Sequence, residues 1–132
     1  MAYKVFISAT HKDMDLARDL AHRLEEAGVK VFSVEQTVVP GEQIVTKVNR
    51  GLRQADEVIV ILTDSSINSP GVISEMGAAF GLHKRVTPVV VGIEPEDLPS
   101  LVKQMQYIRY ADLYDYIAEL KKRAKAPEPQ PA

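Results

Sequence analysis

The chain lacks cysteine, tryptophan and any long apolar run. Without cysteine it can form no disulfide framework, thiolate nucleophile or zinc knuckle, and such usage is typical of a reducing compartment, so we expect a cytoplasmic protein. The first hydrophobic stretch, Val5 to Ile7, is too short for a signal peptide, and no apolar run approaches the ~20 residues that span a bilayer. The sequence therefore predicts no membrane association.

The chain also has no excess of positive charge. Lysine and arginine total 16 against 18 acidic residues, a net charge of −2, so nucleic-acid binding is not expected. The 132 residues have ordinary globular composition, which predicts one domain, placed at residues 1–123. Pro127, Pro129 and Pro131 alternate near the end, so residues 124–132 are predicted to form a proline-rich tail or linker.

Strand-like and helix-like periods alternate along the chain. Leucines at positions 16, 20 and 24 predict a helix that begins after Asp13 and ends at Gly28. Short loops between alternating elements favour a parallel sheet with right-handed crossovers. We therefore expect an α/β, flavodoxin-like three-layer sandwich with helices on both faces of a five-stranded parallel sheet of order 2-1-3-4-5. The expected strands are Tyr3–Ser8, Val29–Val34, Val58–Leu62, Val86–Val91 and Tyr107–Tyr110. The other expected helices carry Ile44 to Leu52, run from Pro70 to about Leu82 and from Leu98 to Met105, and carry Leu113, Ile117 and Leu120.

Ligands of such a sheet bind beyond the carboxyl ends of the strands, at the point where successive strands turn opposite ways. Here that point lies between the first and third strands. The loops expected to meet there are residues 9–13, 64–71 and 35–42.

Glu75 is the candidate for chemistry. Ser69-Pro70 is typical of an N-cap followed by proline at the first helical position. Glu75 then falls at the edge of the apolar stripe, so its carboxylate is expected to point toward the crevice; a partly exposed glutamate near the helix N-terminus is the alternative. The residues expected to form the buried stripe are Val72, Met76, Ala79 and Phe80.

Other familiar chemistries have no motif here. The chain has no phosphate-binding GxxxxGK[ST] loop, no GxGxxG after the first strand and no nucleophile elbow. His11, His22 and His83 have no second histidine at ligand spacing, so no metal site is expected. The hydroxyl residues at strand ends are more typical of turns and caps than of nucleophiles; they are Ser8, Thr10, Ser65 and Ser66.

Three segments together resemble a bacterial-type TIR (Toll/interleukin-1 receptor) domain, over nearly the whole chain to about Leu120. Val5–Asp13 is similar to the family's first box, a strand that ends in a small polar loop before an acidic residue. Val31-Phe32 followed by Val39–Ile44 is similar to the second strand and the BB loop with its Pro-Gly turn. Ser69–Gly77 is similar to the segment that carries the catalytic glutamate of TIR enzymes.

This resemblance implies an enzyme that hydrolyses or cyclises NAD⁺ at the nicotinamide–ribose bond, with NAD⁺ as substrate and no cofactor. It implies Glu75 as the catalytic residue, and Gly71 stands where family enzymes often have tryptophan. The residues that it places in the substrate site are Ser8, Ala9, Thr10, Phe32 and Gly71.

The resemblance also implies partners. The BB loop would cover the site and meet other TIR domains, in a homo-oligomer or filament formed on activation, as in an effector of bacterial anti-phage defence. The residues of that loop are Val38, Val39, Pro40 and Gly41. Two alternatives stay open: a TIR interaction module without chemistry, and an enzyme like the nucleoside deoxyribosyltransferases, in which the glutamate is a covalent nucleophile.

Overall fold

The centre of the molecule is a parallel sheet. In the computed structural model, which describes residues 3–36 and 53–125, five strands pair in the order β2-β1-β3-β4-β5, and each neighbouring pair is parallel. The predicted fold class and strand order are confirmed. The strands are β1 (Val5–Ala9), β2 (Val31–Gln36), β3 (Glu57–Leu62), β4 (Arg85–Val90) and β5 (Ile108–Arg109).

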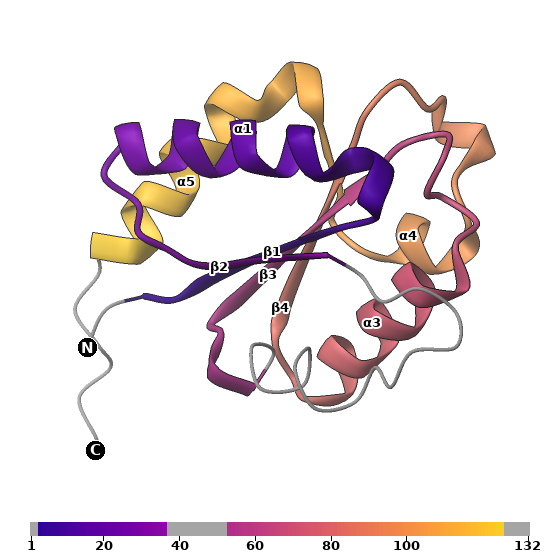
Figure 1. The fold of residues 1–132 in the computed structure, drawn as a ribbon, viewed down its shortest axis with the longest axis horizontal. Helices are drawn as coiled ribbons and strands as arrows, with labels where there is room; N and C mark the ends of the chain where they lie inside the picture. The colour runs from indigo at the N-terminus through magenta and orange to yellow at the C-terminus, as the bar shows by residue number, and fades with distance from the viewer. Residues whose placement is uncertain (1–2, 37–52, 126–132) are drawn as a thin grey trace.

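Helices cover both faces of this sheet. Figure 1 shows α1 (Met14–Glu26) and α5 (Leu113–Lys125) on one face, and α3 (Pro70–Gly81) and α4 (Ser100–Gln104) on the other. The single helix predicted from Leu98 to Met105 is shorter and follows a separate 3-10 turn. Within residues 3–36 and 53–125, such turns are η1 (His11–Asp13), η2 (Pro95–Asp97) and η3 (Tyr110–Asp112). The helix predicted to carry Ile44 to Leu52 lies outside the described residues.

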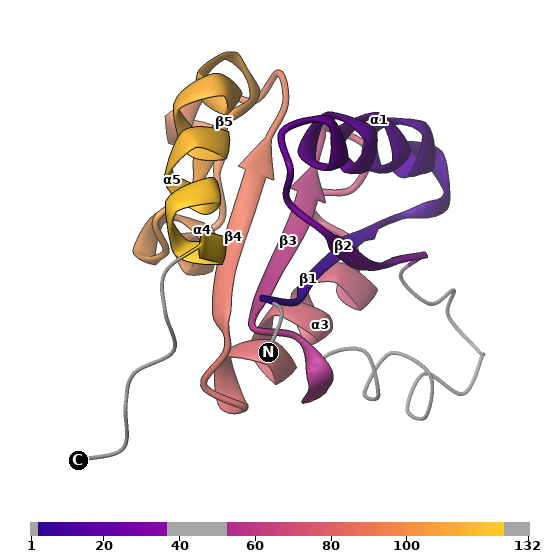
Figure 2. The same ribbon diagram turned by 90° about the vertical axis from the view of Figure 1, so that its left-hand side faces the viewer.

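Two apolar layers hold the helices to the sheet. β1 and β3 are buried along their whole length, as expected for strands covered on both faces. Because side chains alternate along a strand, Phe6, Val58 and Val60 pack under α3, whereas Ile7 and Ile59 pack under α1 and α5. Figure 2, turned by 90°, shows the same arrangement, with α1 and α3 on opposite sides of β1 and β3.

The ends of the helices follow the sequence signals in part. Gly28, at φ +88°, ends α1 in the left-handed conformation that glycine adopts without strain. The amide of Ile73 donates to the Ser69 carbonyl (3.1 Å), which makes Ser69 the N-cap of α3 as predicted. Asp13 occupies the N-cap position of α1, but its carboxylate makes no capping hydrogen bond.

The prediction that Phe80 is buried is wrong. Val72, Met76 and Ala79 are buried on α3 as expected, whereas Phe80 is 65% exposed. At ~100° per residue, Phe80 lies about 80° around the helix from Val72, beyond the stripe that faces the sheet. It lines a cavity at the β4 edge instead.

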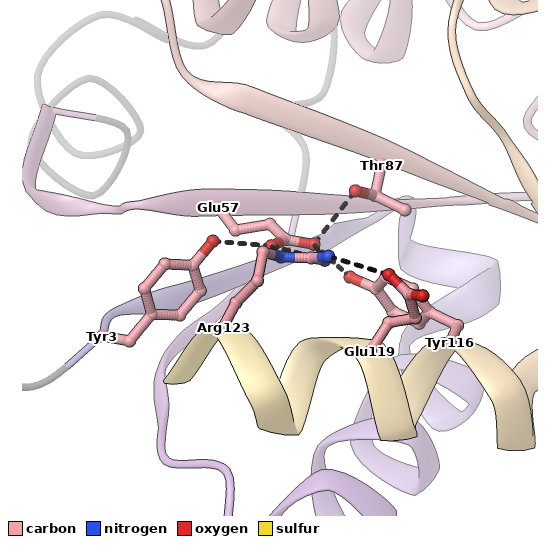
Figure 3. Close-up of polar contacts among 6 residues, drawn as sticks. All are labelled: Tyr3, Glu57, Thr87, Tyr116, Glu119 and Arg123. Carbon is pink, nitrogen blue, oxygen red and sulfur yellow. Dashed lines mark hydrogen bonds and ion pairs between the residues drawn. The ribbon is translucent and has the colours of Figure 1, made fainter. Parts of the chain in front are cut away.

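A buried carboxylate joins α5 to the sheet at the amino ends of β3 and β4 (Figure 3). Glu57, fully buried, accepts hydrogen bonds from Tyr3 (2.7 Å), Thr87 (3.0 Å) and Tyr116. The guanidinium of Arg123 pairs with both of its oxygens at 3.0–3.1 Å. A buried charge with this many partners is satisfied only while α5 stays docked.

Removal of Arg123 should therefore be costly. We expect Arg123→Met to lower the free energy of unfolding by about 3 kcal/mol, because it leaves a buried carboxylate without its cation. Arg109→Met, which breaks the exposed Arg109–Asp112 pair, should cost less than about 1 kcal/mol. Urea denaturation measures both. Equal effects would mean that the Glu57 charge is solvated in the folded protein.

The same cluster predicts alkaline instability. Burial and the hydrogen bond to Glu57 raise the pKa of Tyr3 to about 12, and burial beside Glu57 also raises the pKa of Tyr116. Because unfolded tyrosine ionises near pH 10, the folded chain holds these protons longer, and stability falls as pH rises from about 10 toward 12. Urea denaturation across that range should show the fall, and Tyr3→Phe should make it shallower. An identical slope in the variant would contradict this linkage.

Candidate functional site

The carboxyl ends of β1 and β3 lie side by side, as the expected ligand site requires. Ser8 of β1 is in register with Val60 of β3, so the loops that follow the two strands are adjacent. Asp13, 5% exposed, connects them. The Thr63 hydroxyl donates to both carboxylate oxygens of Asp13, at 3.0 Å to Oδ1 and 2.9 Å to Oδ2. The Thr10 hydroxyl donates to Asp13 Oδ2 at 3.2 Å.

Two serines complete this arrangement, which we call the Asp13 cluster (Asp13, Thr10, Thr63, Ser65, Ser66). Ser65 Oγ lies 2.8 Å from Thr63 Oγ1 and 3.4 Å from Asp13 Oδ1. Ser66, fully buried, accepts the Thr63 amide at 2.8 Å. This bond closes the turn after β3, so the prediction that Ser66 is a turn residue is confirmed.

Ser8 has a buried hydroxyl without a partner. It is 0% exposed, and its Oγ has no hydrogen-bond partner in the described part of the chain. By strand alternation it shares the face of Phe6, which is the face that α3 covers. An unpaired buried hydroxyl costs about 1–3 kcal/mol, so a polar group at this position needs a reason, and a ligand that completes the bond is one.

Ala9 differs from the expectation. It is the last residue of β1, fully buried among apolar side chains under α1, and not part of a loop outside the core. Thr10 does lie in the loop, partly exposed, with its hydroxyl in the Asp13 cluster.

Phe32 is not brought to this site. The register of β1 and β2 runs from Val5 with Val31 to Phe6 with Ser33, so Phe32 is the extra residue of a bulge. Phe32 is 39% exposed, and the centre of its ring lies 5.2 Å from the ammonium of Lys4, just before β1 begins. This is the amino end of the strands, opposite Ser8 and Thr10.

Glu75 and Gly71 lie on the helix that follows β3. Gly71 is the second residue of α3, and Glu75 is in its second turn. The side chain of Glu75 lies outside the structural description, but its neighbours Val72 and Met76 pack in the same apolar cluster as Phe6. The backbone of Glu75 is therefore on the α3 face, which is also the face of Ser8.

The BB loop stays a prediction, because the segment Val38–Gly41 lies outside the described residues. Among the described residues, no group of three or more acidic or histidine side chains could hold a metal ion, and no helix is long and apolar enough to cross a membrane.

A cavity of about 450 Å³ lies elsewhere, along the part of β4 that precedes its pairing with β5. Arg85, Thr87, Gln104 and Arg123 are among its lining residues, and no predicted site residue is. It is open and mixed in charge, and it does not lie at the carboxyl ends of β1 and β3. We therefore place the candidate site at the Asp13 cluster and α3.

Sequence reasoning missed the role of Asp13 and Thr63. Asp13 has the position of a helix cap, and Thr63 was not distinguished from other loop residues. The available signal was their placement, because each is a polar residue just beyond one of two adjacent buried strands. Such pairs are expected to meet at the strand ends of a parallel sheet.

Two serines of equal burial give a direct test of the unpaired hydroxyl. Ser8→Ala should leave the free energy of unfolding unchanged or raise it by up to about 1 kcal/mol, because the lost hydroxyl made no bond. Ser66→Ala should lower it by about 1–2 kcal/mol, because the Thr63 amide loses its acceptor. Urea denaturation of both variants is the measurement, and equal losses would mean that Ser8 is hydrogen-bonded in solution.

The chain is similar to known proteins in sequence and in fold. The probable 2′ cyclic ADP-D-ribose synthase BdTIR of Brachypodium distachyon is 26% identical over 100 residues, which are 73% of this chain and 44% of that protein. The chain thus spans less than half the length of this relative.

Solved structures share the fold at lower identity. The TIR domain of the Toll-related receptor TRR-2 from Hydra magnipapillata superposes with TM-score 0.66 at 18% identity, over 89% of this chain and 97% of that one. A metazoan TIR-STING receptor from C. gigas gives TM-score 0.66 at 22% identity, over 93% of this chain and 40% of that one. Residues 5–123 match the TIR domain family, and the chain belongs to that family.

Proposed function

We propose that this TIR domain cleaves NAD⁺ at the bond between nicotinamide and ribose, with Glu75 as the catalytic carboxylate. The observation that carries the proposal is the meeting of three features at the carboxyl end of the sheet. They are the helix that bears Glu75, the unpaired buried hydroxyl of Ser8 and the loop of Thr10. The name of the Brachypodium relative, a probable 2′ cyclic ADP-D-ribose synthase, supports the substrate class.

The chemistry suits a single carboxylate. When the C1′–N1 bond breaks, its electron pair goes to the ring nitrogen of the pyridinium, and nicotinamide leaves as a neutral molecule. No general acid is needed, in contrast to an O-glycoside, whose leaving oxygen must be protonated. The remaining requirement is to stabilise positive charge on the ribose, and a preorganised carboxylate does this most effectively in a site that excludes water.

The other residues bind and orient. The Ser8 hydroxyl has no partner among the described residues, and a bound ligand gives it one. Ala9 and Thr10 come directly after Ser8, at the carboxyl end of β1. Parallel sheets bind nucleotides at this end of their strands. Gly71 in the first turn of α3 adds no side chain that would block a ligand there.

The ribosyl cation then meets a nucleophile. Water gives ADP-ribose and releases a proton, whereas a nucleophile of the same molecule closes a ring and also loses a proton. Which product forms depends on which nucleophile is nearer to C1′, so chromatography of the products decides between hydrolysis and cyclisation.

The alternative is an interaction module with the same fold and no turnover. The TIR fold is compatible with an enzyme and with an interaction module, and so is self-association through Val38–Gly41. The third reading, a deoxyribosyltransferase-like enzyme, requires a covalent intermediate on the glutamate. Incubation with NAD⁺, and separately with a deoxynucleoside plus a free base, separates the three by their products.

Glu75→Gln tests the catalytic assignment. The amide keeps the size of the side chain but not its charge, so we expect NAD⁺ consumption to fall at least 100-fold, with stability within about 1 kcal/mol of the wild type. Chromatographic rates and urea denaturation are the measurements.

Glu119→Gln is the matched control, since Glu119 is an exposed glutamate on α5, and it should keep the wild-type rate. If Glu75→Gln retains more than about a tenth of that rate, the carboxylate supplies less than ~1.4 kcal/mol to the transition state and is not the catalytic residue.

A further inference from the structure

The carboxylate of Asp13 is buried and accepts hydrogen bonds from a residue far away in the sequence. It is 5% exposed, and it accepts from Thr63, which is 50 residues further along the chain, at 2.9 and 3.0 Å. Its position before α1 would allow it to cap that helix, but its side chain makes no capping bond. Local helix stability therefore does not explain why a carboxylate is buried here.

A continuous series of hydrogen bonds leads from Asp13 to α3. Thr63 donates its hydroxyl to Asp13 and its amide to Ser66 Oγ at 2.8 Å. The Ser66 carbonyl accepts the amide of Ser69 at 2.9 Å, and the Ser69 carbonyl accepts the amide of Ile73 at 3.1 Å. Ile73 is two residues before Glu75, so the series ends at the turn of α3 that carries the proposed catalytic carboxylate.

The carboxylate of Asp13 also binds the loop that follows β1, on the other side of the proposed site. Thr10 donates its hydroxyl to Asp13 Oδ2 at 3.2 Å, and the amide of Asp13 donates to the Thr10 carbonyl at 2.9 Å. The end of β1 and the start of α3 are thus fixed to one group. Their apolar contacts, in the cluster that joins Phe6 to Val72 and Met76, are non-directional and do not by themselves set a distance to a fraction of an ångström.

We propose that Asp13 is a positioning residue, which sets the separation between the nucleotide-binding end of β1 and the helix that carries Glu75. The inference rests on the proposed function for its catalytic consequence. Asp13 does not itself contact the reacting atoms; it acts through Thr63 and Thr10. A displacement of about 1 Å at a catalytic group can cost ~100-fold in rate, so loss of this connection should lower turnover more than binding.

Thr63→Val is the informative variant, because valine keeps the shape of threonine and removes the hydroxyl that joins α3 to Asp13. We expect kcat for NAD⁺ to fall at least about 10-fold with KM within about threefold of the wild type, since Thr10 stays bonded to Asp13. Thr63→Ser, which restores the hydroxyl, should recover most of kcat.

Thr87→Val is the matched control. It removes a comparable hydroxyl, which donates to a buried carboxylate, Glu57, at 3.0 Å, but at the amino end of the sheet. If loss of stability alone lowered activity, the two valine variants would fall together. A Thr63→Val enzyme with kcat equal to that of Thr87→Val would overturn the positioning role.

Amide hydrogen exchange tests the geometry without reference to catalysis. In Thr63→Val the amides of Ser69 and Ile73 should exchange at least about 10-fold faster, while amides of the central strand β3, such as Ile59, keep their protection. Unchanged exchange at Ile73 would refute the positioning of α3 by Asp13 even if the enzyme turns over NAD⁺. Conversely, a wild-type protein without NAD⁺ turnover would refute the proposed function, and the exchange result would still decide the role of Asp13 in fixing α3.

Discussion

The pairing of β1 with β3 is the constraint on which the rest of the structure depends. The register from Val5 with Glu57 to Ser8 with Val60 leaves the two loops beyond the strands at the same level. Both strands are buried on both faces, so a slip by one residue would exchange the α1 side for the α3 side of every side chain. The apolar layers thus determine where the polar residues at the strand ends meet.

A buried carboxylate lies at each end of this sheet. Glu57, at the amino end, binds the guanidinium of Arg123 and the hydroxyls around it, and so fixes α5 to the sheet. Asp13, at the carboxyl end, is bound by the hydroxyls of loop residues and joins β1 to α3. The first arrangement includes a cation and holds α5 against the sheet, whereas the second lies where parallel sheets bind ligands and is suited to holding a site in shape.

Much of the fold could be predicted because its signals are local and repeated. The continuous aliphatic run of β3 indicated a strand covered on both faces, and Gly28 and Ser69 marked helix ends through backbone chemistry that needs no tertiary context. Phe80 shows the limit of this approach, because a position at the margin of an apolar stripe is buried only if a neighbouring element covers it.

The site was less accessible from sequence. The resemblance to TIR domains placed Glu75, Ser8 and Thr10 near the carboxyl end of the sheet, but it also included Phe32, which is the second residue of β2 and so lies at the amino end. Ala9 could not be recognised as a core residue, because a small side chain at a strand end fits a loop equally well. The contact of Asp13 with Thr63 spans 50 residues, and no local pattern encodes a hydrogen bond over that separation.

The proposed function requires NAD⁺ to bind at the carboxyl ends of β1 and β3. Backbone amide shifts recorded by NMR while NAD⁺ is added to the Glu75→Gln protein test it most directly, because the substrate then persists. Saturable shifts are expected at Thr10, Asp13, Thr63 and the first turn of α3. Shifts confined to Arg85, Thr87 and Gln104, which line the cavity beside β4, would contradict it.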